Sequence, residues 1–368
     1  MTGSLSRLGD YLRLVPRGGP AICNVFVTNV CNATCGFCNF AHDKGFVLDR
    51  GWLDADRIGE ALRLMHERAD LRFIVLTGGE PLLHPRLPEI AAAATAAGIQ
   101  PTLVTNGWLL PAKLDALDKA GLKTVIVSVD APDAATHERN RGLKGVFGRI
   151  REANAGMAAR GMLPVASVAM TRLVGDYRRL AETLRELGFP AVTFSYPRKE
   201  AFSTSSLVWS DSELVDLSGA ELLAALDAVD SVRDIIHVQN PRASMDDLRR
   251  RLRGEPERFV CHAGYKYFYL DWTYTLWRCE DWREPIGPVW EFDRSRVIRD
   301  GCQACTTDCY RDASVMLQAS VALGDAFANI AKGQLGAAAG ALADRRNAAS
   351  AGAVMGQGAH LSRMAGLR

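Results

Sequence analysis

Six short apolar runs alternate with helical patterns between residues 21 and 196, and this alternation constrains the possible fold more than any other feature. The apolar residues of each run are continuous rather than alternating with polar ones, which is typical of parallel strands that are covered on both faces. The runs span 21–28, 71–77, 101–105, 124–130, 164–170 and 191–194. The helical patterns span 55–67, 87–97, 112–120, 147–159 and 177–187. Several of them stop at a glycine, which tolerates the positive φ of a helix end, as at Gly98, Gly121, Gly161 and Gly188.

Six strand–helix units in succession predict an α/β fold, a parallel partial (β/α)6 barrel over residues 1–200. The alternation then stops, and we expect a helical connector over 201–255, a cluster-binding appendage over 256–312 and a helical tail over 313–368. The tail is rich in Ala and Gly, and weaker order is expected after Ala348. One face of its helical pattern carries Met316, Leu323, Phe327 and Ile330. Because the βα loops meet at the carboxyl ends of parallel strands, we expect the chemistry at that edge of the sheet.

The composition is that of an ordinary globular protein, with 368 residues, 48% of them apolar and 23% charged. A formal net charge of +2 gives no reason to expect a nucleic acid as partner. The N-terminus lacks the apolar segment of a secretory signal, and no run of about 18 apolar residues would span a bilayer. These features predict a cytoplasmic protein, whose nine cysteines stay reduced.

Eight of the nine cysteines fall into two groups, which in a reducing compartment indicates metal binding. The first group follows directly on the first predicted strand and consists of Cys31, Cys35 and Cys38. The second group consists of Cys261, Cys279, Cys302, Cys305 and Cys309. Cys23 belongs to neither, and its place in an apolar run predicts a small buried side chain.

Three thiolates in the first group can hold three irons of a 4Fe–4S cluster and leave the fourth iron without a protein ligand. Zinc is the alternative for this group. A structural zinc site needs four closed ligands, and His42 is the nearby residue that could complete them.

The spacing C-x3-C-x2-C after the first strand, with the aromatic Phe37 before the third cysteine, resembles the signature of radical S-adenosylmethionine (SAM) enzymes. The resemblance implies that Cys31, Cys35 and Cys38 hold a 4Fe–4S cluster whose open iron binds the amino and carboxylate groups of SAM. It further implies that an electron from the cluster cleaves SAM to a 5′-deoxyadenosyl radical. An electron donor such as flavodoxin or ferredoxin follows from the same resemblance.

Further candidate cofactor-binding residues lie at the ends of the next strands. The turn that contains Gly78, Gly79 and Glu80 resembles the GGEP element of the same family, which contacts the amino group of SAM. Its glycines would let the backbone approach a ligand, and Glu80 can accept a hydrogen bond from an ammonium group. Taken alone, such a turn is often only a loop.

Polar residues at the ends of the third and fourth strands resemble those that reach the ribose and carboxylate of SAM in this family. They are Asn106, Ser128 and Asp130, for which a turn or a helix cap is the alternative. Arg141 lies in a segment similar to the family's RG-containing loop, and its cation is a candidate partner for the SAM carboxylate.

The second cysteine group contains a predicted hairpin over 265–278, which would bring Cys261 near Cys279. Together with the CxxC pair Cys302 and Cys305, these cysteines resemble the shortened SPASM appendage called the twitch domain, which binds an auxiliary 4Fe–4S cluster. Cys309 is then left over as a replacement ligand, a free thiol or a hydrogen-atom donor, and it is our candidate catalytic residue. A zinc ribbon is the alternative for this group.

These features predict an enzyme that cleaves SAM and modifies an organic substrate by hydrogen abstraction, whether as oxidoreductase, rearranging enzyme or transferase. The segment from Cys302 to Val315 also resembles the adenosylhopene transferase type, which implies adenosyl or alkyl transfer to an isoprenoid or hopanoid lipid. In that case the tail would contact a membrane peripherally. A non-catalytic iron–sulfur or zinc scaffold is the third alternative. The substrate class stays open between small molecule, peptide and lipid.

Three acidic residues beside the second cysteine group are candidate acid–base groups. They are Glu280, Asp281 and Asp308. The alternative is that they are solvated loop residues.

Overall fold

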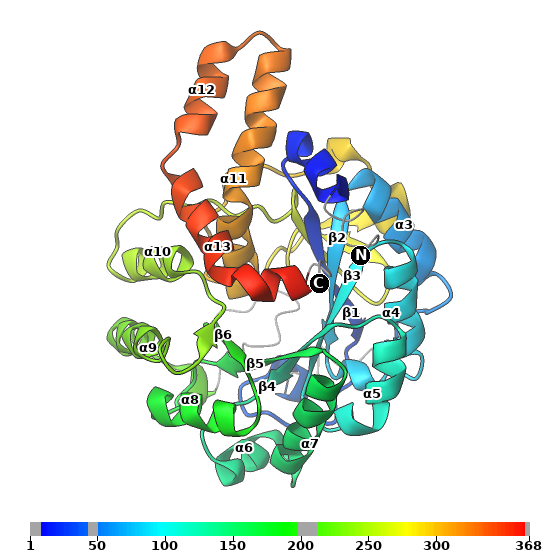
Figure 1. Ribbon diagram of the computed structural model, residues 1–368, viewed down its shortest axis with the longest axis vertical. Helices are drawn as coiled ribbons and strands as arrows, with labels where there is room; N and C mark the ends of the chain where they lie inside the picture. Colours follow the sequence, from blue (N-terminus) through cyan, green and yellow to red (C-terminus); the bar gives the residue numbers. More distant parts are fainter. Residues whose placement is uncertain (1–8, 43–50, 198–211, 365–368) are drawn as a thin grey trace.

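The computed structural model describes residues 9–42, 51–197 and 212–364, and its centre is one β-sheet (Figure 1). Within these residues the sheet has ten strands in the order β10-β9-β8-β1-β2-β3-β4-β5-β6-β7. The first seven strands are β1 (Ala21–Thr28), β2 (Leu71–Gly78), β3 (Gln100–Thr105), β4 (Thr124–Ser128), β5 (Leu163–Ala169), β6 (Ala191–Ser195) and β7 (His237–Val238). All of these are parallel to their neighbours.

The seven parallel strands curve around a common interior. Side chains from β1 to β6 line the same cavity, among them Asn24 on β1, Thr102 on β3 and Thr193 on β6. A flat sheet could not bring the first and sixth strands to one cavity, so the sheet is a partial barrel. The predicted α/β fold class is confirmed, and the six predicted strands match β1–β6 within two residues at each end.

The helices of the barrel cover the outer face of the sheet (Figure 1). They are α3 (Ile58–Arg68), α4 (Leu87–Ala96), α5 (Leu110–Lys119), α6 (Ala134–Arg141), α7 (Val146–Ala159) and α8 (Tyr177–Glu186). The strands are buried on both faces, by these helices on the outside and by side chains on the inside. This burial explains their continuous apolar runs. The four predicted stop glycines all have positive φ, between 67° and 89°.

A hairpin of β8 (Tyr267–Leu270) and β9 (Thr275–Trp277) extends the sheet beyond β1. The hairpin itself was expected, but its place was not, because β8 pairs with β1 as a parallel neighbour. A further antiparallel strand, β10 (Pro285–Pro288), follows β9. The predicted appendage therefore shares one sheet with the barrel, and the domain boundary at residue 256 stays a prediction.

The remaining helices complete the connector and the tail. They are α2 (Asn39–His42), α9 (Gly219–Ser231), α10 (Arg242–Leu252), α11 (Asp308–Ala331), α12 (Leu335–Ala343) and α13 (Arg346–Met364), with short 3-10 turns at Val15–Arg17, Pro81–Leu83, Glu213–Val215, Val289–Glu291 and Arg294–Arg296. Part of the predicted connector, residues 201–211, lies outside the described residues. The stretch after Ala348 belongs to α13 up to Met364, with a kink at Gly358, and the expected weaker order there stays a prediction.

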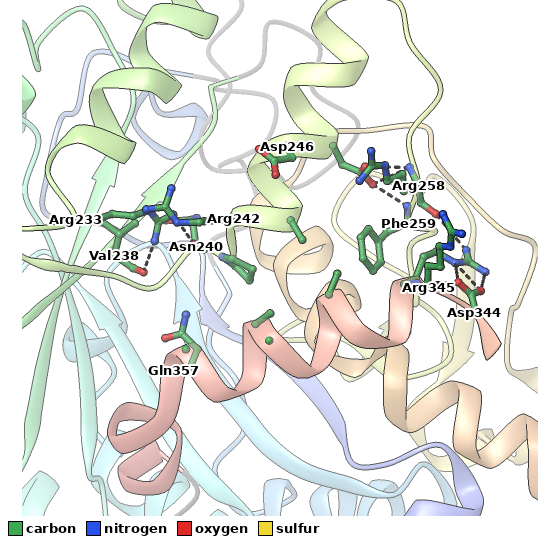
Figure 2. Close-up of a pocket in the computed structure, with 18 of the residues that line it drawn as sticks. Arg233, Val238, Asn240, Arg242, Asp246, Arg258, Phe259, Asp344, Arg345 and Gln357 are labelled. Atoms are coloured by element: carbon green, nitrogen blue, oxygen red, sulfur yellow. Dashed lines mark hydrogen bonds and ion pairs between the residues drawn. The ribbon is translucent and has the colours of Figure 1, made fainter. Parts of the chain in front are cut away.

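A large cavity of about 1010 Å³ lies outside the barrel, between α10, β7 and α13 (Figure 2). Its walls include Arg233 and Asn240 near β7 and Gln357 on α13. None of the catalytic, cofactor-binding or metal-binding residues predicted from the sequence lines it.

A buried carboxylate ties together the starts of β1, β2 and β8. Asp70 precedes β2, and its Oδ2 lies 3.3 Å from Nζ of Lys266, which precedes β8. The same ammonium donates to the carbonyl of Gly19 before β1, at 2.8 Å. The side chains of Asp70 and Lys266 are each 1% exposed, so water cannot replace either partner.

We expect Asp70→Asn to lower the free energy of unfolding by about 3–5 kcal/mol, because Lys266 would keep a buried charge without its counter-charge. Asparagine keeps the shape of the side chain and tolerates the positive φ of 60° at this position. Chemical denaturation measures the change. The matched control is Asp56→Asn, which removes an exposed ion pair with Arg86 and should leave stability unchanged. An equal loss in both variants would contradict the role of the Asp70 pair.

Candidate active site

A cavity of about 420 Å³ opens inside the curved sheet and reaches the carboxyl ends of its strands. It is lined by Cys31, Cys35 and Cys38, by every predicted cofactor-binding residue (Phe37, Gly78, Gly79, Glu80, Asn106, Ser128, Asp130 and Arg141), and by Cys309. The other four predicted metal ligands, Cys261, Cys279, Cys302 and Cys305, do not line it. The structure thus brings the predicted residues into two places, with Cys309 in the first.

The turn after β2 packs directly against the chain that leaves β1 toward the first cysteine. The amides of Gly79 and Glu80 donate to the carbonyls of Thr28 and Val30, both at 2.8 Å. A Cβ on Gly79 would lie 2.3 Å from the Val30 carbonyl oxygen, and one on Gly78, whose φ is 124°, would lie 2.2 Å from that of Thr28. The glycines were expected to admit a ligand, but the atoms they approach belong to this neighbouring backbone.

Glu80 links the ends of β2 and β3. Its carboxylate accepts from Thr105 Oγ1 at 2.7 Å and from the amides of Leu82 and Asn106 at 2.9 and 2.8 Å. The side chain is buried, and burial raises its pKa against the opposing effect of these hydrogen bonds. Asn106 extends the link, because its Nδ2 donates to Asn32 in the cysteine loop at 2.8 Å. Glu80 therefore positions the strand ends as well as facing the cavity.

Asp130 and Arg141 form a buried bidentate ion pair beside the cysteine loop, with N–O distances of 2.8 and 2.6 Å. Burial opposes both charges, but each partner stabilises the other, so the pKa of Asp130 is lowered and that of Arg141 is raised. Cys35 and Cys31 also contribute to the raised pKa of Arg141. Among the described residues that line the cavity, Arg141 carries the cation that could face an anionic ligand.

Helix α6 also holds the cysteine loop through hydrogen bonds. The amide of Thr34 donates to the carbonyl of Arg141 at 3.0 Å, and the amide of Gly36 donates to Asn140 Oδ1 at 3.1 Å. Asn140 Nδ2 in turn donates to Asp130 at 2.9 Å. The strand end, the helix and the cysteine loop therefore form one connected unit.

The first cysteine group has the chemistry of a cluster site. Burial raises the pKa of the Cys31 thiol to about 12 and also raises that of Cys35 and Cys38. A bound iron–sulfur cluster would supply the positive charge that turns such thiols into thiolate ligands. The three thiols lie close together, since Cys35 and Cys31 contribute to the raised pKa of Cys38.

Neither cysteine group has the geometry of a site for one metal ion. In the part of the chain that the structure describes, no three His, Cys, Asp or Glu side chains converge closely enough to hold a single ion. A zinc ion requires sulfur ligands at about 2.3 Å, whereas a 4Fe–4S cube holds its ligands further apart. His42, the candidate fourth zinc ligand, has its Nε2 2.9 Å from the Cys35 carbonyl oxygen.

The second cysteine group lies between the β8–β9 hairpin and the chain that enters α11. The amide of Cys261 donates to the carbonyl of Cys302 at 2.8 Å. Burial raises the pKa of Cys261 to about 11, and nearby Cys305 and Cys302 contribute to the rise. Burial raises the pKa of Cys279 as well, and Cys305 and Cys261 contribute to that rise. Four thiols are therefore gathered in one place, as four ligands of a cluster would be.

Cys309 lies in the first turn of α11 and faces the cavity. It lies beside a polar network that the sequence did not reveal. Asn24 Nδ2 lies 3.9 Å from its Sγ and donates to Glu280 at 2.7 Å. Tyr267 Oη donates to Asn24 Oδ1 at 2.9 Å. A possible signal was present, since Asn24 is a polar residue within the apolar run of β1.

Two carboxyl groups of α11 face the same cavity. Burial and then the neighbouring Asp308 raise the pKa of Asp312 to about 8, so this group is largely protonated at neutral pH. One of its oxygens has no hydrogen-bond partner among the described residues, and the other accepts from Asn240 at 2.7 Å.

Glu280 and Asp308 are only 8% and 9% exposed, so they are not solvated loop residues. Asp281 accepts from Thr307 at 2.7 Å and does not line the cavity.

Residues 25–197 match the family model of the radical SAM superfamily. The chain is 31% identical over 276 residues to a probable GTP 3′,8-cyclase of Aeropyrum pernix, which covers 73% of this chain and 75% of that protein. With this coverage, the chain belongs to the radical SAM superfamily.

Other similarities cover less. A PqqA peptide cyclase of Ruegeria pomeroyi is 33% identical over 168 residues, which covers 44% of this chain and 43% of that protein. The chain spans only 35–45% of the length of several such relatives. Streptococcus suis SuiB, solved with S-adenosylmethionine, shares the fold with a TM-score of 0.53 at 16% identity, covering 71% of this chain and 60% of SuiB.

We expect Gly79→Ala to displace the chain between β1 and Cys31, because the added Cβ meets the Val30 carbonyl. The variant should lose about 1–3 kcal/mol of unfolding free energy and retain less iron at the first cysteine group. Iron analysis after anaerobic reconstitution, together with chemical denaturation, checks both effects. Gly148→Ala is the matched control, since a Cβ on Gly148 in α7 meets nothing within 4 Å. Identical behaviour of the two variants would show that the turn tolerates a side chain.

Proposed function

We propose that this chain uses SAM and a 4Fe–4S cluster to abstract a hydrogen atom from an organic substrate bound in the barrel cavity. One observation carries the proposal: the cysteine triad, the predicted SAM contacts and Cys309 all line a single cavity. When bound, the cluster supplies the electron that cleaves SAM to a 5′-deoxyadenosyl radical.

The residues of the cavity have separate roles in this proposal. Cys31, Cys35 and Cys38 ligate the cluster. Arg141, oriented by its bidentate pair with Asp130, faces the carboxylate of SAM. Glu80 keeps the strand ends aligned and offers a carboxylate at the cavity wall to the amino group of SAM.

The other four cysteines are the proposed ligands of an auxiliary 4Fe–4S cluster. The proximity of Cys261 to Cys302 and Cys305, and of Cys279 to Cys305, supports this set. The position of Cys309 supports it further, because Cys309 lines the SAM cavity and the other four do not.

Cys309 is the proposed hydrogen-atom donor to the substrate. Its S–H bond breaks as a C–H bond forms on the substrate radical, which leaves a sulfur-centred radical on Cys309. One electron from a low-potential donor such as flavodoxin or ferredoxin and one proton from solvent restore the thiol. Asn24, 3.9 Å from Sγ, orients the thiol toward the cavity.

The substrate is set by the residues around this thiol. Relatives are named for GTP and for a peptide, so similarity alone does not select a substrate class. Asp308 and Asp312 line one part of the cavity and suit a polar, hydrogen-bonding group. Ile22, Val104 and Ile126 line the interior between the strands and suit an apolar part.

The anaerobically reconstituted protein should bind about eight irons, as two 4Fe–4S clusters require. With SAM and dithionite it should release 5′-deoxyadenosine. Replacing Cys31, Cys35 and Cys38 together by alanine should remove about half the iron and all of this product, because the auxiliary cysteines remain. Chromatography of the products and iron analysis measure both results. A wild-type protein that binds zinc at the triad, or never cleaves SAM, would identify a scaffold instead of an enzyme.

In a background without the first triad, alanine variants of Cys261, Cys279, Cys302 and Cys305 should each lose most of the remaining iron, because each removes a cluster ligand. Cys309→Ala should keep that iron, since its thiol faces the cavity. With the triad restored, Cys309→Ala should still cleave SAM. Iron content and cluster spectroscopy check the set. Loss of the auxiliary cluster in Cys309→Ala, with retention in Cys302→Ala, would instead make Cys309 the fourth ligand.

A further inference from the structure

The end of α11 and the whole of α12 form a projecting hairpin, here called the tail hairpin, over residues 323–343 (Figure 1). Nine large hydrophobic side chains are exposed among the described residues, and five of them lie on this hairpin. They are Leu323, Phe327, Ile330, Leu335 and Leu342. The concentration of exposed apolar side chains on one small projection marks it as a binding surface.

The tip of the tail hairpin is exposed on all sides, whereas the part of α11 that leads to it keeps Gly324 and Ala326 buried. Every residue from Ile330 to Ala337 is exposed, which covers the last two residues of α11, the hairpin tip and the first three residues of α12. Within α12 only Ala338 is buried, although its sequence is almost entirely apolar. A helix that is apolar all round is normally enclosed, either in a protein core or in lipid.

The charges of the tail hairpin fit an anionic surface. Lys332 is the one charged residue between Asp325 and Asp344, so no carboxylate lies on the tip. Asp325 itself pairs with Arg299 at 2.8 Å, which neutralises it. Arg345 is exposed at the base of the hairpin, immediately after Asp344.

The other half of α11 excludes a simple transmembrane role. Among the described residues α11 is the one helix long and apolar enough to cross a membrane, a feature that the search for apolar runs in the sequence missed. Its first half, however, is buried in the protein, and Cys309, Asp312 and Met316 line the SAM cavity. Only the projecting half is available to lipid, which favours attachment at the interface over spanning.

A bilayer explains the exposure better than a protein partner does. A standard protein–protein interface buries about 800 Å² per partner, so a protein that packs against one side of the projection leaves its other side in water. The headgroup and acyl region of a bilayer surrounds an inserted projection on every side. Lys332 can extend its ammonium group to the phosphates while its methylene groups stay among apolar atoms.

We propose that the tail hairpin docks this protein on an anionic lipid bilayer. Phe327, Ile330 and Leu335 insert at the boundary between headgroups and acyl chains, and Lys332 and Arg345 face anionic headgroups. Because α11 runs from the hairpin to the cavity wall, docking fixes the distance between the active site and the membrane surface. The proposal does not depend on the reaction at the cysteine clusters.

Flotation of the iron-loaded protein with vesicles tests the proposal. The wild type should bind vesicles of phosphatidylcholine with phosphatidylglycerol at least tenfold more tightly than vesicles of phosphatidylcholine alone. Each inserted large side chain should contribute about tenfold or more to partitioning, so the double variant Phe327→Ser, Leu335→Ser should bind about a hundredfold more weakly. Met355→Ser is the matched control, because Met355 is 74% exposed on α13, outside the hairpin, and its loss should change nothing.

Two results would overturn the proposal. One is the absence of vesicle binding by the wild type, or binding that does not distinguish the two lipid compositions. The other is a lipid-free dimer in analytical ultracentrifugation that the double variant abolishes, which would make a second copy the occupant. Release of 5′-deoxyadenosine by the double variant, measured without lipid, should equal that of the wild type. This readout separates failure of docking from failure of the proposed reaction.

Discussion

The close packing of the turn after β2 against the chain leaving β1 is the contact on which the site depends. Two glycines allow it, and the amides of Gly79 and Glu80 secure it with hydrogen bonds to the carbonyls of Thr28 and Val30. The same turn orients Glu80 across to the end of β3. The cysteine loop thus starts from a fixed point, and the neighbouring strand ends are aligned with it.

A second constraint, the buried pair of Asp130 and Arg141, holds the other side of the cysteine loop. Removing two charges from water is costly, and the geometry offsets this cost with bidentate hydrogen bonds and with further bonds from Asn140. The pair also concentrates positive charge next to the thiols. The same residues therefore hold the cysteine loop in place and set the charge around the cofactor. Only a double-mutant cycle can separate these two contributions.

Helix α11 connects three features of the molecule that have separate roles. Its first turn presents Cys309 to the cavity, its first two turns pack beside the second cysteine group through Tyr310 and Ala313, and its end projects as the tail hairpin. A rigid helix of 24 residues spans about 36 Å, so it fixes the distance between the cavity and any surface that the hairpin binds. The three features are consequently positioned by one element.

The sequence alone determined the strand and helix order, the stop glycines and both cysteine groups, because hydrophobic periodicity and ligand spacing are local properties. The predicted SAM contacts all line the cavity, because they lie at the ends of predicted strands or in the loops and helix after them. Only the tertiary structure decided that β8 pairs with β1, that Asn24 and Tyr267 surround Cys309, and that Asp312 faces the same cavity. These contacts join residues more than 200 positions apart, as Asn24 and Glu280 show, and no local pattern encodes such a distance. The direction of the Cys309 thiol likewise depends on the packing of α11 across the barrel opening, not on the spacing between cysteines.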